Sequence, residues 1–347
     1  MSGDHPAWDE EVEAYLEALG RGDRAAALAR VLHLERAGQD VLAIILGLLA
    51  PAQLRVGELW LADDWSVAQE HAATAVSESV IASLALARAR EAPPTPSAPA
   101  VVVSCVEQEW HALPALMVAE HLRADGYTVS YLGANASSSA LVRHVHETGP
   151  AAVLLSCSLS AFLPLVRRQV EAVRETGTPV VVGGSAFDPE GRRARVLGAS
   201  GFAASAHDVP DVLRALPAGV PPAPPLQHAG AEEGYVVFGA REDLAEEVER
   251  LVAADLRLPR EAGAAGEPEW RVVLRDQLPH VVGSVAGALV VDDPQVVRHA
   301  LTWAGRVLEH RGAPDRAGLV LRTALGAVLR DLPVASAVLA TVAPLSP

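Results

Sequence analysis

The sequence of 347 residues contains only two cysteines, Cys105 and Cys157, too few for a disulfide framework or a cysteine-based zinc site. Basic residues are also scarce, with 28 Lys and Arg against 43 Asp and Glu, which gives a net charge of −15. Because contacts to phosphates come from clusters of Lys and Arg, this balance argues against nucleic acid as a partner.

Long apolar runs and a signal peptide are missing as well. The longest apolar run, residues 41–52, is shorter than the roughly 20 residues that a membrane span needs. The N-terminus does not have a basic segment followed by an apolar one, as a signal peptide would. We therefore expect a protein of the reducing cytoplasm, with no membrane partner.

Half of the residues are hydrophobic, and the length suits two or three domains. Two proline-rich stretches, residues 92–99 and 217–234, favour extended backbone and are interpreted as linkers. The sequence thus predicts three domains, at residues 1–92, 99–217 and 234–347.

Apolar residues recur at helical spacing in the first segment, which predicts four helices, at about 8–18, 23–36, 39–62 and 66–90. Ser66 and Gln69 form a candidate capping box at the start of the last one. Short loops between helices favour antiparallel neighbours, so we expect a small helical bundle.

The second segment alternates short β-branched runs with amphipathic stretches. Strands are expected at 100–105, 129–132, 152–156 and 180–182, and helices at 112–125, 138–148, 163–176 and 208–215. This alternation predicts a doubly wound parallel sheet, in which a ligand lies outside the carboxyl ends of the strands.

The third segment is expected to be all-helical, with helices near 240–256, 268–290, 294–311 and 315–331 and with Trp303 in its core. It contains no zinc, phosphate-loop or nucleophile motif, so the sequence gives no support for an enzyme there.

The loop after the first strand carries Glu109, Trp110 and His111. A Glu two residues before a His can hydrogen-bond one ring nitrogen and leave the other free for a metal. Taken alone, this loop fits an ordinary surface histidine better.

Small residues follow three further strands, at Gly133, at Ser156-Cys157-Ser158 and at Gly183-Gly184. With Glu109-x-His111, this order resembles the cobalamin-binding Rossmann-like domain shared by methionine synthase, corrinoid shuttle proteins and light-sensing cobalamin repressors. The Glu form of the first motif is the one in the light-sensing branch. Pro114 stands where the family has Gly, and Ser158 where it has Leu.

The resemblance implies that His111 is the lower axial cobalt ligand and displaces the benzimidazole of the cofactor. Ser156 would contact the nucleotide tail, and Gly183-Gly184 would let backbone approach it closely. Glu109, Trp110, Gly133 and Ser158 would complete the binding site.

In the first segment, Trp60 is followed after nine residues by Glu70-His71. Such residues can be a satisfied core network. The local sequence nevertheless resembles the cobalamin cap of the light-sensing branch, where these positions surround a 5′-deoxyadenosyl group. Leu61 stands where those repressors have a second cobalt-binding His, so a bis-histidine light state is not expected through that position.

The order of cap, cobalamin domain and helical domain resembles the photocobilins, which add a globin-like domain that holds a bilin such as biliverdin. His280, His299, Trp303 and Arg306 are the candidate bilin contacts by residue type and spacing. Arg298, His299 and Arg306 fit a solvated helix face equally well.

Three functions are compared. The first is a light sensor, not an enzyme, that uses adenosylcobalamin and a bilin and signals through self-association as a dimer or through a separate effector protein. The second is a corrinoid methyl carrier of a methyltransferase system. The third, an adenosylcobalamin mutase subunit, would need a substrate barrel for which the chain is too short.

Overall fold

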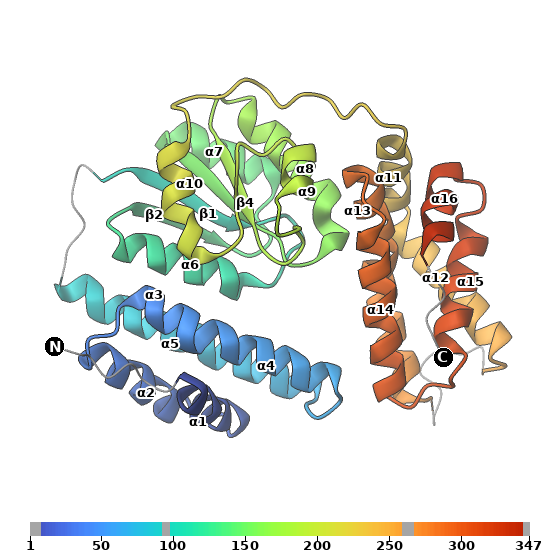
Figure 1. Cartoon of the computed structure of the whole chain (residues 1–347), viewed down its shortest axis with the longest axis horizontal. Coiled ribbons are helices and arrows are strands. Elements are labelled where there is room, and N and C mark those ends of the chain that lie inside the picture. The colour runs from blue at the N-terminus through green and yellow to red at the C-terminus, as the bar shows by residue number, and fades with distance from the viewer. Residues whose placement is uncertain (1–7, 92–97, 259–266, 343–347) are drawn as a thin grey trace.

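The computed structural model describes residues 8–91, 98–258 and 267–342. They form a helical cap, a parallel sheet with helices on both faces, and a C-terminal set of helices (Figure 1). This architecture confirms the predicted combination of an α/β fold with all-helical parts.

The cap places its helices close to the predicted ranges. They are α1 (Trp8–Gly20), α2 (Arg24–Arg36), α3 (Val41–Ile44), η1 (Ile45–Leu49), α4 (Ala50–Leu61) and α5 (Val67–Glu91). Segments α3, η1 and α4 run as one helical stretch. Gly47 lies in its wider central turn, where a Cβ would come within 2.4 Å of the Trp8 ring. The predicted capping box is confirmed, since Gln69 N–H donates to Ser66 Oγ at 3.3 Å and Ser66 N–H donates to Gln69 Oε1 at 2.9 Å.

Residues Val41–Leu61 are long and apolar enough to cross a membrane by length and composition. Ile44, Leu48 and Leu49 in this segment are fully buried inside the cap. The segment is therefore a core helix of the cap, as its shorter apolar run predicted.

The sheet is entirely parallel, with strand order β2-β1-β3-β4-β5. Its strands are β1 (Ala100–Cys105), β2 (Thr128–Gly133), β3 (Ala152–Ser156), β4 (Val180–Gly183) and β5 (Gly201–Ala203). The prediction missed β5, because three residues that begin with glycine leave almost no strand pattern.

Helices cover both faces of the sheet. They are α6 (Ala112–Ala124), α7 (Ser138–Thr148), η2 (Ser160–Phe162), α8 (Leu163–Arg174), α9 (Arg192–Val196), η3 (Ala206–Asp208) and α10 (Val209–Ala215). Side chains of α6 and α10 share a core with Val101 and Val103, whereas α7 and α8 pack with Val102 on the other face. Because all strands point the same way, their carboxyl ends meet at one edge of the sheet.

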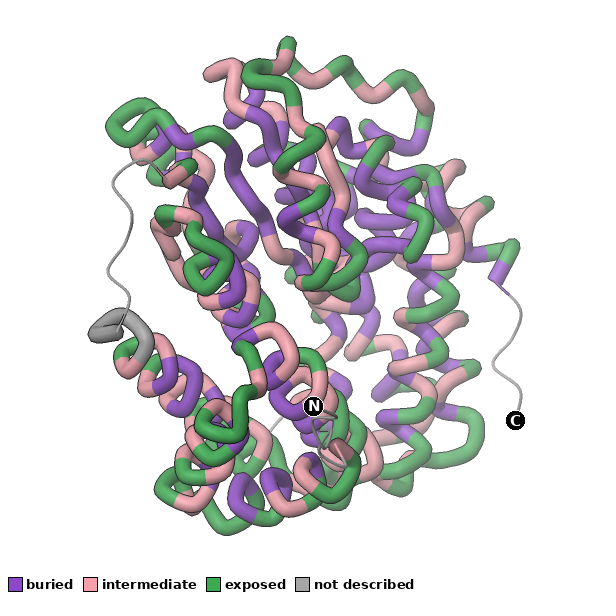
Figure 2. The backbone as a smooth tube through the Cα atoms, turned by 60° about the vertical axis from the view of Figure 1, so that its left-hand side comes forward, coloured by how far each residue is buried: buried purple, intermediate pink, exposed green. Residues whose placement is uncertain are grey.

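The C-terminal part contains two helices that the sequence did not predict, α11 (Gly230–Gly239) and α16 (Pro333–Thr341). The others are α12 (Arg241–Asp255), α13 (Glu269–Val291), α14 (Gln295–His310) and α15 (Ala317–Val328). Helix α11 occupies the end of the expected linker 217–234, since only residues 217–229 lack helix or strand there. Figure 2 shows buried positions gathered in the strands and on the inner sides of these helices.

The linker is fixed to the sheet domain by two buried arginines. Arg167 donates to the Pro224 carbonyl at 2.5 Å, and Arg174 donates to the Pro221 carbonyl at 3.0 Å. Because buried guanidinium groups need partners, these bonds hold the linker against α8. The C-terminal helices therefore have a fixed position beside the sheet.

Helix α13 packs directly on η2 through two glycines. A Cβ on Gly287 would lie 2.3 Å from the Ser160 carbonyl oxygen, and one on Gly283 would lie 2.8 Å from Ala161 Cβ. The Ser160 and Ser284 hydroxyls are hydrogen-bonded at 3.0 Å. As a result, one continuous hydrophobic core joins the sheet to the C-terminal helices.

Candidate functional site

The loop between β1 and α6 holds a buried carboxylate beside an exposed imidazole. The Glu109 side chain is fully buried, whereas the His111 side chain is 55% exposed. Glu109 Oε1 accepts hydrogen bonds from His111 Nδ1 at 2.5 Å and from the His111 backbone N–H at 3.1 Å. Glu109 Oε2 accepts from the backbone N–H groups of Ser158 at 2.8 Å and Leu159 at 3.0 Å. Both oxygens are thus satisfied, and the imidazole is fixed at Nδ1.

These contacts change the pKa values of both partners. Burial alone would raise the pKa of Glu109, but the hydrogen bond and charge of His111 and the backbone N–H groups outweigh it and lower that pKa. The hydrogen bond to Glu109 raises the pKa of His111, although burial opposes the rise. A proton is therefore held on Nδ1. Among the residues that the structure describes, nothing hydrogen-bonds Nε2, which remains available for a metal.

Two residues with left-handed backbone support this loop, and sequence reasoning missed both. Gln108 has φ of 67° and Asn135 has φ of 52°. The Gln108 N–H donates to Asn135 Oδ1 at 2.9 Å, and the Asn135 N–H donates to the Glu109 carbonyl at 3.0 Å. From α12, Arg241 donates to Gln108 Oε1 at 2.8 Å. The loop that carries His111 is therefore braced by the β2 end and by the C-terminal helices.

The fold itself requires the glycine pair Gly183-Gly184 at the end of β4. Gly184 has φ of 111°, and a Cβ there would lie 2.3 Å from the Cys157 carbonyl oxygen. A Cβ on Gly183 would lie 2.9 Å from the Ala203 carbonyl oxygen. Close backbone packing between neighbouring strand ends explains both glycines, whereas the approach to a nucleotide tail that the resemblance implied stays a prediction. Gly133 also has positive φ, at 75°, with open space around it.

The remaining predicted residues of this edge lie around the loop. Ser156 is half-buried at the end of β3, and Ser158 contributes its backbone N–H to Glu109. The Trp110 side chain is 71% exposed next to His111. An exposed indole beside a fixed imidazole offers a flat apolar surface for a planar ligand.

The cap presents Glu70 and His71 near the loop. Glu70 Oε1 accepts from the Thr74 hydroxyl at 3.1 Å, and its Oε2 lies 3.4 Å from His71 Nε2. The charge of Glu70 also contributes to the raised pKa of His111, so the two side chains lie within electrostatic range of each other. The same hydroxyl oxygen lies 3.3 Å from Gln53 Oε1, on the neighbouring helix α4.

Trp60, near the end of α4, contacts the C-terminal helices. Its ring stacks with that of Trp303 from α14, with centroids 5.8 Å apart and planes at 17°. The Arg311 guanidinium lies 4.7 Å from the centre of the Trp60 ring. Trp303, expected in the core of the third domain, is only half-buried: it packs against the edge of that core and also on Trp60 of the cap.

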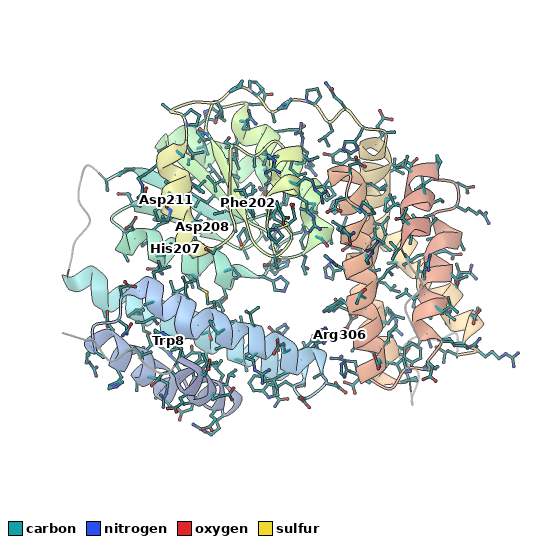
Figure 3. The ribbon with its side chains drawn as sticks, in the orientation of Figure 1. Trp8, Phe202, His207, Asp208, Asp211 and Arg306 are labelled. Atoms are coloured by element: carbon teal, nitrogen blue, oxygen red, sulfur yellow. The ribbon has the colours of Figure 1, made fainter. Side chains whose placement is uncertain are left out.

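The four candidate bilin contacts face the other two parts of the molecule. His280 packs edge-on against Phe162, with ring centroids 5.7 Å apart. His299 is exposed on α14 and lines a pocket, and Arg306 projects from the same helix toward the cap (Figure 3). These contacts and the stack of Trp303 on Trp60 lie in separate places, so the four side chains do not converge on one pocket.

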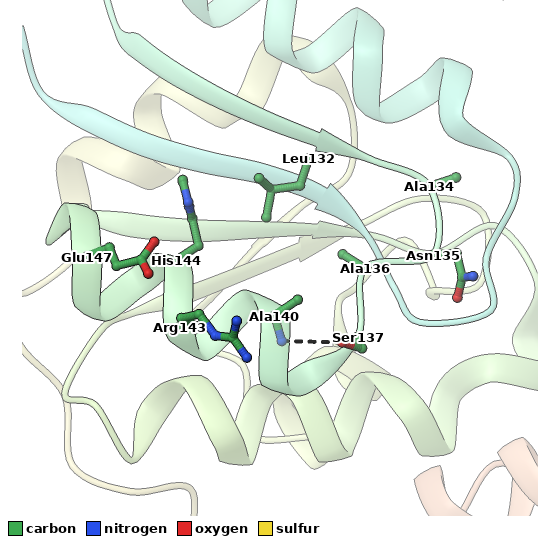
Figure 4. Close-up of a pocket in the computed structure, with 9 residues that line it drawn as sticks. All are labelled: Leu132, Ala134, Asn135, Ala136, Ser137, Ala140, Arg143, His144 and Glu147. Atoms are coloured by element: carbon green, nitrogen blue, oxygen red, sulfur yellow. Dashed lines mark hydrogen bonds between the residues drawn. The ribbon is translucent and has the colours of Figure 1, made fainter.

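Two surface pockets accompany the sheet. One, of about 490 Å³, lies between the end of β2 and α7 and is lined by Asn135, Ser137, Arg143, His144 and Glu147 among others (Figure 4). The other, of about 370 Å³, lies between the segment after β4 and α14 and includes Arg192 and His299. None of the predicted cobalamin residues lines either pocket.

The residues present fit a metal that is already held by the ring of a cofactor and needs only one ligand from the protein. Within the described ranges, no group of three or more His, Cys, Asp or Glu side chains could hold a metal ion. A single imidazole with a fixed tautomer, at the ligand-binding edge of a parallel sheet, suits cobalt in a corrin ring.

Comparisons with known proteins find B12-binding domains in this chain. Residues 99–213 match the family model of the B12 binding domain, and residues 11–85 match a second B12 binding domain model. Neither match extends beyond residue 213. The search of curated protein sequences found no match.

Solved structures match this chain at low identity. The monomethylamine corrinoid protein of Methanosarcina barkeri is 17% identical, with a TM-score of 0.50 over 59% of this chain and 98% of that chain. A cobalamin-binding protein of Desulfitobacterium hafniense is 20% identical, with a TM-score of 0.33 over 58% and 97% of the two chains. The methanol:cobalamin methyltransferase complex of Methanosarcina barkeri is 20% identical, with a TM-score of 0.33 over 63% and 83%.

The two family matches coincide with the cap and with the parallel sheet. The chain therefore contains two B12-binding domains in tandem, a helical one at residues 11–85 and a Rossmann-like one at residues 99–213.

Proposed function

We propose that this protein holds a cobalamin between the sheet edge and the cap, with Nε2 of His111 as the lower axial ligand of the cobalt. The observation that carries this proposal is the buried Glu109 carboxylate, which fixes a proton on Nδ1 of His111 and leaves Nε2 free. When bound, cobalamin supplies a cobalt–carbon bond that can be cleaved by light or can deliver a methyl group. The protein binds the cofactor, orients it and covers its upper face.

A corrinoid methyl carrier is the function that the comparisons support better. Both B12-binding domains are present, and the fold is shared with a corrinoid protein named for monomethylamine. In this role the cap would shield a methyl group and expose it to a partner methyltransferase.

A light sensor that uses adenosylcobalamin is the second candidate, and a feature of the cap favours it. Trp60 and Glu70 lie on either side of the bend between α4 and α5, so an aromatic ring and a carboxylate lie at the same end of the cap. A bulky upper ligand with ribose hydroxyls could use both, whereas a methyl group could use neither. Such a sensor would signal by self-association, for example as a dimer, or through a separate effector protein.

One experiment separates the two functions. Protein loaded in the dark with adenosylcobalamin, methylcobalamin or aquocobalamin is illuminated with green light while its absorption spectrum and molecular mass in solution are followed. A light sensor changes its association state only with adenosylcobalamin. A methyl carrier binds methylcobalamin at least as tightly and keeps the same mass with every cofactor.

A bilin on the C-terminal helices and a location in the cytoplasm remain proposals. For the location, the support is that both cysteines are free thiols buried at the sheet edge. For the bilin, co-expression with a biliverdin source should give a far-red absorption band. A protein with full cobalamin occupancy and no such band would leave these helices without a chromophore role.

A further inference from the structure

The C-terminal helices contact the end of α4, the helix that carries Trp60. Arg311, next to the end of α14, has a side chain that is only 3% exposed. It donates hydrogen bonds to the carbonyls of Trp60 at 2.8 Å and Leu61 at 3.5 Å. These carbonyls belong to the last turn of α4, where no further turn of the helix follows, and the Trp60 carbonyl also accepts from the Asp63 backbone N–H at 3.1 Å. Arg311 thus caps a helix of another domain.

The same arginine and one tryptophan hold the Trp60 ring. The Arg311 guanidinium lies 4.7 Å from the ring centre, a cation–π contact in a nearly dry place. The ring of Trp303 stacks on Trp60 with nearly parallel planes. Arg311 also lies 3.7 Å from Asp63, in the turn after α4. Backbone and ring of Trp60 are therefore both positioned from α14.

The chemistry of these contacts favours a positioning role over plain adhesion. An arginine beside helix-terminal carbonyls opposes the negative end of the helix dipole, and this stabilises the final turn of α4. The stack then limits the rotation of the Trp60 ring. Both effects act on one side chain of the cap, close to the bend that also presents Glu70.

We infer that Trp303 and Arg311 are positioning residues of the upper cobalamin site, and that they set its selectivity for the upper axial ligand. The inference rests on the proposed binding of cobalamin beneath the cap. With Trp60 fixed, the cap offers a rigid aromatic surface to a large upper ligand. Without Trp303 or Arg311, the ring becomes mobile, and a large ligand loses more contact than a small one.

The test compares the affinities for adenosylcobalamin and methylcobalamin, which differ only in the upper ligand, with aquocobalamin as the reference. The full-length protein is titrated in the dark with adenosylcobalamin, methylcobalamin and aquocobalamin, and dissociation constants are taken from absorption spectra. Trp303→Ala and Arg311→Met should each change the ratio of the adenosylcobalamin and methylcobalamin constants about tenfold, against the adenosyl form. Aquocobalamin affinity should stay within about twofold, because that cofactor has no bulky upper group.

Two control variants accompany the test. Trp303→Phe keeps an aromatic ring and should retain most of the ratio. Arg298→Ala removes an exposed arginine of the same helix and should leave the ratio unchanged.

An unchanged ratio in both main variants, with aquocobalamin still bound, would overturn the inference. Equal weakening of all three cofactors, or loss of the helical circular dichroism signal, would also overturn it, because the residues would then serve general folding. Failure of the proposed function is a different result: the wild-type protein would bind none of the three cobalamins.

Discussion

At the residue scale, the site depends on how Glu109 is satisfied. Its two oxygens accept from His111 at two atoms and from two backbone N–H groups of the segment after β3. A buried carboxylate without such partners would be costly to fold. The same contacts fix the orientation of His111, so the buried Glu109 side chain determines that Nε2 is the atom of His111 left for a metal.

Glu109→Gln should disturb both roles. The amide NH₂ would meet either His111 Nδ1–H or the N–H groups of Ser158 and Leu159, which leaves a buried donor unsatisfied at a cost of roughly 1–3 kcal/mol. We expect a lower urea midpoint and a smaller fraction of cobalamin ligated by His111 in the visible spectrum. Glu107→Gln, in the same loop but only weakly bonded to Ser138, is the matched control. Equal behaviour of the two variants would contradict this role.

The raised pKa of His111 predicts a pH dependence of cofactor ligation. Glu109 favours the protonated imidazole, so the pKa rises above its ordinary value of 6.5. In the cofactor-free protein the extra stability from the charged imidazolium is fully present below pH 6.5 and is lost as pH rises through the raised pKa, while the neutral ring keeps its Nδ1–H bond to Glu109. Cobalt competes with the proton on Nε2. Ligation should therefore weaken as pH falls through the raised pKa, which spectra taken at a series of pH values would show.

At the element scale, the carboxyl edge of the sheet determines where the loops lie. Gly184 lies against the backbone of Cys157, and that backbone leads directly to the N–H groups that hold Glu109. The glycine thus couples the β4 end to the site, although it contacts neither His111 nor Glu109.

Gly184→Ala should cost about 2 kcal/mol or more in the free energy of unfolding. An alanine at this position would have to adopt a strained φ of 111°, and its Cβ would collide with the Cys157 carbonyl oxygen. Gly126→Ala is the matched control, because its φ of 90° is also positive but nothing lies within 4 Å of the new Cβ. Chemical denaturation measures both, and an equal cost would contradict the packing argument.

Much of this arrangement could be predicted from the sequence. Strong periodicity located the cap helices, four strands and the helices between them, and the spacing of Glu109 and His111 predicted their hydrogen bond. Short or proline-flanked elements such as β5 and α11 leave too weak a pattern. The braces of the loop, Asn135 and Arg241, come from segments distant in sequence, and so does Arg311 on α4. Local patterns do not report such contacts.

At the scale of the whole molecule, the C-terminal helices contact both sides of the site. Arg241 bonds the loop that carries His111, α13 packs on η2 beside Leu159, and Arg311 caps α4 of the cap. The three parts therefore form one unit around the site, and a disturbance of the C-terminal helices should reach cofactor binding.

Gly287→Ala tests this connection. Its Cβ would lie 2.3 Å from the Ser160 carbonyl oxygen and would push α13 away from η2. We expect lower stability and weaker cobalamin binding. Gly326→Ala, in helix α15, meets nothing within 4 Å and should stabilise the protein by up to ~1 kcal/mol with unchanged binding. Thermal denaturation and titration check both. Normal binding by a destabilised Gly287→Ala protein would contradict the connection.

The most direct test of the central claim is electron paramagnetic resonance of the protein reconstituted with cob(II)alamin. The unpaired electron of Co(II) couples to the nitrogen of its lower axial ligand. If Nε2 of His111 is that ligand, labelling the protein histidines with ¹⁵N should change the nitrogen splitting from a triplet to a doublet. His111→Ala should abolish this response. The account would be contradicted if the splitting stayed the same with ¹⁵N-labelled protein and changed with a ¹⁵N label in the benzimidazole of the cofactor.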